Sequence, residues 1–248
     1  MLSKHTVSIL RSLHLKKYSQ EHNLFLAEGE KLVEEAIKSS PKTIKIICTE
    51  AWFDNNKNIL IPPNISVEYA TAKQISQVST LVTPQEVLAV CQTDFTSASL
   101  RESVNKTVLY FHDLKDPGNA GTILRIADWF GYKDVFVSDE SVYKYNPKLV
   151  QSSMGSVFRI GYHPIHTQEL MQLKGHTEII ATTMSGDSVY GSKKIEKGII
   201  MFGSESHGLP AELIGLADKR LTIPKHKTGN AESLNLAVAT GIILSYLG

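Results

Sequence analysis

Two loops that each follow an apolar run combine glycines with a polar side chain that could bind a ligand or assist catalysis. Residues 113–121 (DLKDPGNAG) allow a tight turn from which the Asn119 amide can project. Residues 203–208 (GSESHG) carry Glu205, a carboxylate that suits a hydroxyl or a cationic ligand better than an anion. Neither loop has the spacing of a dinucleotide fingerprint or the Lys-Ser/Thr pair of a Walker loop. On these grounds alone, each could equally be an ordinary turn before a helix.

A third candidate loop is basic and leads into an apolar segment at 233–247. Residues 225–230 (KHKTGN) precede this segment, and Ser233 and Asn235 stand at its front. Fifteen largely apolar residues are too few to span a membrane and suit a buried helix. Since the first turn of a helix leaves N–H groups unpaired, this polar end predicts a ligand site built against the core.

Arg125 lies six residues after Asn119 in an otherwise apolar run, ILRIA. An arginine in such surroundings either extends its charged end into water or binds an anion. Both interpretations stay open from this residue alone.

Charge is nearly balanced over the 248 residues, with a formal net charge of +1, but it is unevenly distributed. Residues 1–20 and 219–227 contain no acid, and their basic residues are Lys4, Arg11, Lys16, Lys17, Lys219, Arg220, Lys225 and Lys227. Such patches can neutralise the phosphates of a nucleic acid or can simply be solvated faces.

Nothing in the sequence favours a metal centre, a membrane span or export. Cys48 and Cys91 lack metal-ligand spacing and lie in apolar runs, as buried reduced thiols do. His163 and His166 have no third ligand nearby. No apolar run reaches membrane-spanning length, and the N-terminus lacks a signal region. We therefore expect a cytoplasmic protein with no metal and no membrane partner.

Helical and strand-like patterns alternate on both sides of a polar, Ser-rich segment. Residues 94–106 predict a linker between an N-terminal domain at 1–93 and a C-terminal domain at 107–248. The N-terminal domain is expected to be a small α/β unit, with helices at 4–18 and 30–39 and strands at 23–27, 43–49, 66–69 and 87–92.

In the C-terminal domain, strands separated by single helices predict an α/β fold with a parallel sheet. Runs such as IIMF at 199–202 are apolar without alternation, as in a sheet covered on both faces. Ligands of such sheets bind beyond the carboxyl ends of the strands. The expected strands are 108–112, 134–138, 158–162, 178–183, 199–202 and 221–223, and the expected helices are 120–130, 147–153, 168–174, 210–216 and 233–247.

Taken in order, three motifs resemble the SpoU (TrmH-like) RNA 2′-O-ribose methyltransferases of the SPOUT superfamily. They are DPGNAGTILR at 116–125, FGSESHGL at 202–209, and IP followed by ESLN at 223–235. The segment SMGSVF at 153–158 resembles the family's middle region. The resemblance covers residues 107–248, and Ser206 stands where a glycine is common.

The N-terminal part, with FLAEG at 25–29, looks like the L30e-like substrate-binding domain that often precedes this catalytic domain. An arginine that is common a few residues before this strand is absent from the stretch YSQEH at 18–22.

The resemblance implies a deep trefoil knot in the C-terminal domain, S-adenosylmethionine as cofactor, RNA as substrate and a homodimer. It implies cofactor contacts from Gly203, Ile223 and Leu234, largely through the backbone, and from Thr182 and Ser233. It also assigns a catalytic cluster: Asn119, Arg125, Glu205, Ser233 and Asn235.

The implied reaction transfers a methyl group to a ribose 2′-hydroxyl, and the family assigns proton removal to the arginine, here Arg125. A guanidinium stays protonated in proteins, so Arg125 could instead hold the neighbouring phosphate. The appended N-terminal domain favours 23S ribosomal RNA as substrate. The alternatives are a tRNA 2′-O-ribose methyltransferase, a non-catalytic RNA-binding protein with the same fold, and an oxidoreductase, which the missing dinucleotide fingerprint disfavours.

Overall fold

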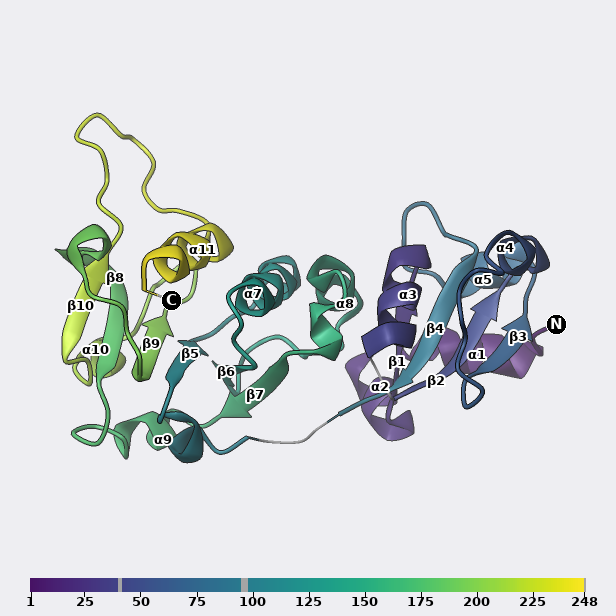
Figure 1. Ribbon diagram of the computed structural model, residues 1–248, viewed down its shortest axis with the longest axis horizontal. Helices are drawn as coiled ribbons and strands as arrows, with labels where there is room; N and C mark the ends of the chain where they lie inside the picture. Colours follow the sequence, from purple (N-terminus) through teal and green to yellow (C-terminus); the bar gives the residue numbers. More distant parts are fainter. Residues whose placement is uncertain (40–41, 95–97, 248) are drawn as a thin grey trace. The chain divides into compact units, whose positions relative to one another are not determined.

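The structure is a computed structural model that describes residues 1–39, 42–94 and 98–247 (Figure 1). It divides into two compact units, one of residues 1–95 and 143–159 and the other of residues 96–142 and 160–248. The sequence-based division places 143–159 in the C-terminal domain, whereas these residues make their contacts with the N-terminal unit. The chain therefore passes between the two units three times.

The N-terminal unit is built on a four-stranded mixed sheet in the order β1-β4-β2-β3, in which only the β2–β3 pair is parallel. Its strands are β1 (Leu24–Glu28), β2 (Thr43–Cys48), β3 (Ser66–Tyr69) and β4 (Val87–Gln92). Its helices are α1 (Lys4–Ser12), α2 (Lys16–His22), α3 (Glu30–Ser39), α4 (Glu50–Asn55), α5 (Ala72–Val78), α8 (Pro147–Ser153) and the short 3₁₀ helix η1 (Ser156–Phe158).

The four strands and helix α3 were predicted, but the single helix expected at 4–18 is wrong. This segment forms two helices, because α1 ends at Ser12, just before the buried Leu13, and α2 begins only at Lys16. Helices α4 and α5 were not predicted from the sequence. Each begins after a threonine, Thr49 or Thr71, whose side chain accepts a hydrogen bond from a backbone N–H of the first turn.

The prediction of a strand at 158–162 is also wrong over its first half, because the strand begins only at Gly161. Helix α8 ends at Met154 in the left-handed conformation (φ 49°), and Gly155 follows at φ 97°. A Cβ at Gly155 would lie 2.7 Å from Glu35 Cγ, so a larger residue would not fit there. The resulting 3₁₀ turn packs Phe158 against Phe25, with ring centroids 6.1 Å apart.

The C-terminal unit contains a six-stranded sheet in the order β10-β8-β9-β5-β6-β7, and every described pairing in it is parallel, as predicted. Its strands are β5 (Thr107–Phe111), β6 (Asp134–Ser138), β7 (Gly161–Ile165), β8 (Ile179–Ser188), β9 (Gly198–Phe202) and β10 (Lys219–Thr222). Its helices are α6 (Leu100–Ser103), α7 (Pro117–Trp129), α9 (Thr167–Met171), η2 (Val189–Gly191), α10 (Ala211–Ile214) and α11 (Leu236–Leu247).

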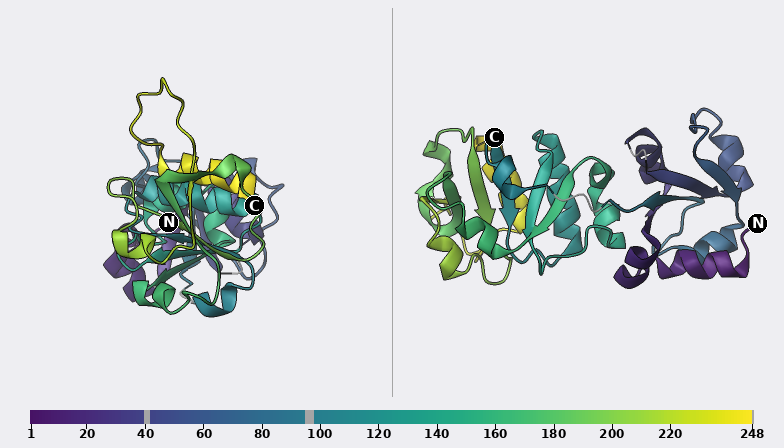
Figure 2. Two further views of the ribbon diagram at one scale, coloured as in Figure 1. Left: turned by 90° about the vertical axis from the view of Figure 1, so that its left-hand side faces the viewer. Right: turned by 90° about the horizontal axis from the view of Figure 1, so that it is seen from below.

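Helices cover both faces of this sheet, which explains its uninterrupted apolar strands. Side chains from α6, α9 and α10 form one core cluster with strand residues such as Tyr110, Phe136 and Met201. Helices α7 and α11 pack against each other, and the two views in Figures 1 and 2 show them together on the other face of the sheet. The apolar α11 buries one side, including Ile243 and Leu244, as predicted, but Val238 and Tyr246 on it are exposed.

The predicted linker at 94–106 contains a short anchored helix, while residues 95–97 lie outside the described part of the chain. Ser99 caps α6, and Leu100 is only 1% exposed. His163 Nδ1 accepts a hydrogen bond from the Ala98 N–H at 3.2 Å, and its Nε2 donates to Asp134 at 2.9 Å. This histidine therefore fixes the start of the C-terminal unit.

Candidate active site

A pocket of about 830 Å³ opens at the carboxyl ends of β9 and β10, beside the middle of β8. Its walls come mainly from three segments, 182–185, 202–209 and parts of 221–236. This is the edge at which ligands of parallel α/β sheets bind, and the volume suits a cofactor-sized molecule. The residues that the resemblance assigns to the cofactor all lie in its lining: Thr182, Gly203, Ile223, Ser233 and Leu234.

The first wall exists because the pairing between β8 and β10 is interrupted. Arg220 pairs with Ala181, but the next residue, Leu221, pairs with Asp187. The residues skipped on β8 leave the ladder, and the first of them, at 182–185, face the pocket. Met184 and Ser185 were not predicted from the sequence, because an apolar run that stops at 183 gives no sign that strand pairing resumes beyond it.

The second wall is a tight turn that requires a glycine. Ser204 and Gly208 exchange two backbone hydrogen bonds of 3.1 and 3.0 Å, and Gly208 has φ 67°. A Cβ on Gly203 would lie 2.1 Å from the Gly208 carbonyl carbon, a distance that side chains never tolerate. Gly203 therefore lets two backbone segments meet and presents main-chain atoms to the pocket.

Beside this pocket, three polar side chains from distant segments form a hydrogen-bonded chain. Asn235 Nδ2 donates to Asn119 Oδ1 at 2.9 Å, and Asn119 Nδ2 donates to Glu205 Oε1. Asn119 sits in the first turn of α7, where Asp116 caps the helix by accepting from the Asn119 N–H at 2.8 Å. The sequence-based cluster is thus assembled in part, with Glu205 and Asn235 joined through Asn119.

Asn235 is also the residue that begins α11. Its Oδ1 accepts hydrogen bonds from the N–H groups of Ala237 (3.0 Å) and Val238 (3.2 Å). The helix expected from 233 consequently starts at Leu236. Ser233 lies outside the helix as an exposed residue of the pocket wall, and within the described part of the chain it makes no hydrogen bond to the cluster.

Arg125 is not hydrogen-bonded to this cluster either. It lies on α7 six residues beyond Asn119, which places it about 120° away around the helix axis. Its side chain is exposed, and it has no hydrogen bond or ion pair within the described part of the chain. Its guanidinium is therefore available to an anionic ligand.

Comparisons with known proteins identify the family. Residues 106–245 match the model of the SpoU rRNA Methylase family, and residues 4–89 match that of the MRM3-like substrate binding domain. The chain belongs to the SpoU rRNA methylase family. It is 32% identical over 247 residues to the 23S rRNA (guanosine(2553)-2′-O)-methyltransferase RlmP of Bacillus subtilis, covering 96% of this chain and 93% of the relative.

Solved structures of RNA methyltransferases share this architecture across both units. A putative RNA methyltransferase of the TrmH family from Porphyromonas gingivalis is 31% identical, with a TM-score of 0.85 over 100% of this chain and 98% of that one. An AdoMet-bound rRNA methyltransferase from Sinorhizobium meliloti is 29% identical, with a TM-score of 0.82 over 100% and 95% of the two chains.

In this SpoU chain the loop after β5 carries titratable groups that the sequence-based analysis overlooked. Burial lowers the pKa of His112 below its usual value. The negative charge of Asp113 opposes this shift, and the positive charge of Lys115 adds a smaller lowering. Lys115 pairs with Asp113 at 2.7 Å, a contact that raises the pKa of Lys115. Asp113 itself adopts φ 54°, a conformation uncommon outside glycine. A single histidine at a strand end has no motif by which it could have been found.

Among the residues that the structure describes, no group of three or more His, Cys, Asp or Glu side chains could hold a metal ion. The helices of this part of the chain also include none with the length and apolar character that crossing a membrane requires.

Proposed function

We propose that this chain is an S-adenosylmethionine-dependent RNA methyltransferase that methylates a ribose 2′-hydroxyl of 23S ribosomal RNA. The observation that carries the proposal is the hydrogen-bonded chain from Asn235 through Asn119 to Glu205, built from the three family motifs beside the pocket. The RlmP relative, which matches nearly the whole chain, acts on 23S rRNA according to its name.

The residues of the pocket fit S-adenosylmethionine. Glu205, Glu232 and Lys225 give the pocket charges of both signs, as the ligand has in its sulfonium, ammonium and carboxylate groups. Apolar residues such as Leu236 and Ile243 offer a surface for its adenine ring. We infer that Gly203, Ile223 and Leu234 hold it mainly through main-chain atoms, with Thr182 and Ser233 beside them. When bound, this cofactor supplies a methyl group activated by the positive sulfur.

The polar cluster serves the acceptor ribose. Asn119 is held from both sides, by Asn235 and Glu205, so its amide keeps one orientation. Glu205 is exposed and can accept a hydrogen bond from a ribose hydroxyl. Such fixed groups align the acceptor oxygen with the methyl donor, which is what an already activated donor needs from its enzyme.

Arg125 holds the phosphate next to the target ribose. A guanidinium is a strong bidentate phosphate ligand and does not lose its proton at neutral pH. Its positive charge favours the ionised form of the nearby 2′-hydroxyl, whose proton leaves to water or to the phosphate. Arg125 is therefore assigned as a phosphate ligand rather than as the base.

The active form is a homodimer joined through α7 and α11. Trp129 at the end of α7 is 85% exposed and Val238 on α11 is 52% exposed, although the two helices pack together. Exposed large apolar side chains on neighbouring helices are typical of subunit interfaces. Sedimentation of a Trp129→Glu variant should give the monomer mass, while an unchanged mass would contradict this interface.

Three further features belong to the proposal. The segment that ends in α11 passes through a trefoil knot, as the resemblance to the SpoU family implies. Residues 1–93 bind RNA, residues 94–106 connect the two domains, and residues 107–248 catalyse, except that 143–159 pack in the N-terminal unit. The protein works in the cytoplasm, in line with two buried cysteines that form no disulfide.

The decisive experiment maps ribose methylation across total RNA from cells with and without this gene. One 2′-O-methyl group in 23S rRNA should be lost with the gene and restored by the wild-type chain. Loss of a tRNA methyl group instead would assign the alternative substrate. Unchanged methylation together with no cofactor binding in calorimetry would identify a non-catalytic RNA-binding protein.

A further inference from the structure

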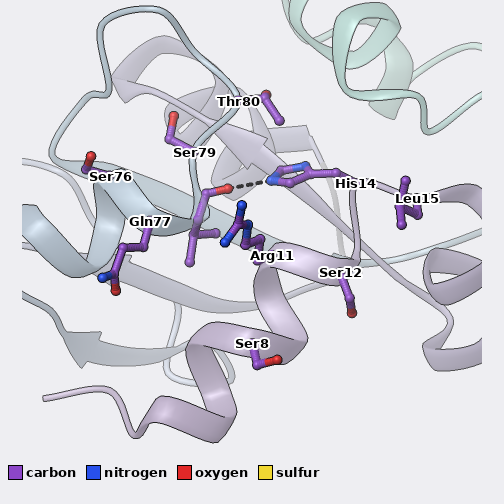
Figure 3. Close-up of a pocket in the computed structure, with 10 residues that line it drawn as sticks. Ser8, Arg11, Ser12, His14, Leu15, Ser76, Gln77, Ser79 and Thr80 are labelled. Carbon is purple, nitrogen blue, oxygen red and sulfur yellow. Dashed lines mark hydrogen bonds between the residues drawn. The ribbon is translucent and has the colours of Figure 1, made fainter.

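A second groove, of about 650 Å³, lies within the N-terminal unit between α1 and the end of α5 (Figure 3). Two segments line it, 8–15 on one side and 76–80 on the other, and most of the lining side chains are polar: Ser8, Arg11, Ser12, His14, Ser76, Gln77, Ser79 and Thr80. None of the lining residues is acidic.

Arg11 is the charged group of this groove. Figure 3 shows its guanidinium pointing from α1 toward the end of α5, beside the hydrogen bond of His14. Arg11 is exposed and has no ion pair or hydrogen bond among the residues that the structure describes. Lys4 lies on the same face of α1, seven residues earlier, and Lys73 lies three residues before Ser76 on α5. Both walls therefore continue into basic residues.

The groove is preformed, because its end is tied down by hydrogen bonds. His14 Nε2 donates to the Val78 carbonyl at 2.5 Å and so joins the end of α1 to the end of α5. The Glu28 carboxylate, 7% exposed, accepts from the Thr80 N–H at 3.1 Å and from the Thr80 hydroxyl at 2.7 Å. The Glu28 carboxylate is thus already bonded to the groove wall.

Other polar side chains of the groove are left available. Ser8, Ser76 and Gln77 make no hydrogen bond within the described part of the chain. The Arg11 guanidinium offers charged N–H donors, and these three side chains add neutral donors and acceptors beside it. Such a set matches a phosphodiester with its adjoining sugar hydroxyls.

We infer that this groove binds the sugar-phosphate backbone of the substrate RNA, with Arg11 on a phosphate and Ser8, Ser76 and Gln77 on neighbouring oxygens. The inference rests on the proposed function, since it names where the N-terminal unit holds the RNA that the other unit methylates. Contacts of this kind add affinity and salt dependence but read no sequence.

The test uses the full-length chain and unmodified 23S rRNA transcribed in vitro. Arg11→Gln removes the charge, and Ser76→Glu places a carboxylate on the opposite wall at an exposed position. Arg101→Gln removes an exposed arginine on α6, outside the groove, and serves as the matched control. RNA binding is titrated over a range of salt concentrations, and methyl transfer is measured at saturating RNA. Circular dichroism and thermal melts show that each variant is folded, and calorimetry gives its affinity for S-adenosylmethionine.

Arg11→Gln should weaken RNA binding about tenfold, as expected for loss of a hydrogen bond to a charged group, and should reduce the log–log salt slope by about 0.7–0.9. Ser76→Glu should weaken RNA binding at least as much, whereas Arg101→Gln should bind RNA like the wild type. In all three variants the affinity for the cofactor and the methyl-transfer rate at saturating RNA should stay at wild-type values. Wild-type binding and salt slope in both groove variants, or no RNA binding by the wild-type chain, would overturn the inference. A wild-type chain that binds RNA through Arg11 but methylates none would refute the proposed function and leave the groove assignment standing.

Discussion

The Asn235 amide donates to Asn119 Oδ1 at 2.9 Å, so two residues that are 116 positions apart hold the beginnings of α7 and α11 together. The side-chain oxygen of the same Asn235 caps α11, and the Asn119 amide in turn donates a hydrogen bond to Glu205. One side chain thus has a structural task and a proposed catalytic task, and these can be separated by substitution.

Asn235→Asp should separate them. An aspartate still accepts the hydrogen bonds of Ala237 and Val238, but a carboxylate has no N–H to donate to Asn119. We expect thermal stability close to wild type with a methyl-transfer rate about 10- to 100-fold lower. Asn235→Ala should lose the rate and also about 1 kcal/mol of stability, because the cap is lost as well. A wild-type rate in the aspartate variant would show that the Asn119 contact has no part in catalysis.

Arg125→Ala should lower methyl transfer by at least about 100-fold while cofactor affinity stays within a factor of two, because the arginine serves the RNA and not the methyl donor. Arg125→Lys should recover part of the rate, since an ammonium still binds phosphate as a point charge. Rates come from incorporation of labelled methyl groups, and affinities from calorimetry. If Arg125→Ala turns over like the wild type, the exposed guanidinium is simply solvated.

Gly203→Ala should abolish tight cofactor binding. A methyl group there would lie 2.1 Å from the Gly208 carbonyl carbon and 2.2 Å from the Leu209 nitrogen, so the turn at the pocket wall must open. Gly191→Ala is the matched control, because a Cβ at that position meets nothing within 4 Å. Calorimetry should show an affinity loss of more than about tenfold for the first variant only, in line with displaced pocket contacts. Equal affinities would mean that the turn does not shape the cofactor pocket.

How stability depends on pH should reveal the burial of His112. Burial lowers the pKa of this histidine in the folded protein, so the unfolded chain takes up a proton at a higher pH than the folded chain does. The contribution of neutral His112 to the free energy of unfolding is therefore full above the ordinary histidine pKa of about 6.5. This contribution is lost as the pH falls below that value. His112→Gln should lose less stability between pH 7 and pH 5.5 than the wild type. Thermal melts across this range provide the measurement, and parallel curves for the two proteins would exclude the effect.

The sequence predicted the parallel sheet because its strands are apolar on both faces, as β9 illustrates. It also placed the polar loops at the carboxyl edge, where the pocket lies. It did not predict that residues 182–186 of β8 are unpaired with β10, because the pairing of a residue depends on the neighbouring strand as well as on its own type. The packing of 143–159 on the N-terminal unit was equally hidden, because stacking such as that of Tyr145 on Phe25, at 4.3 Å, joins residues far apart in the chain. Local patterns carry information about local structure, whereas these features depend on tertiary contacts.

The last prediction concerns the atom that receives the methyl group. The cluster around Asn119 offers amide and carboxylate groups to a ribose, and the proposed role of Arg125 is on a phosphate, so neither reads a base. An RNA with a single 2′-deoxy sugar at the target nucleotide should bind with little loss of affinity, because phosphate contacts provide most of it. It should accept no methyl group, because the nucleophilic oxygen is gone. Mass spectrometry of nuclease digests locates the added group on the matched ribose-containing RNA. A methylated base, or continued turnover on the deoxy RNA, would assign the enzyme to base modification and remove the reason for placing Arg125 beside a 2′-hydroxyl.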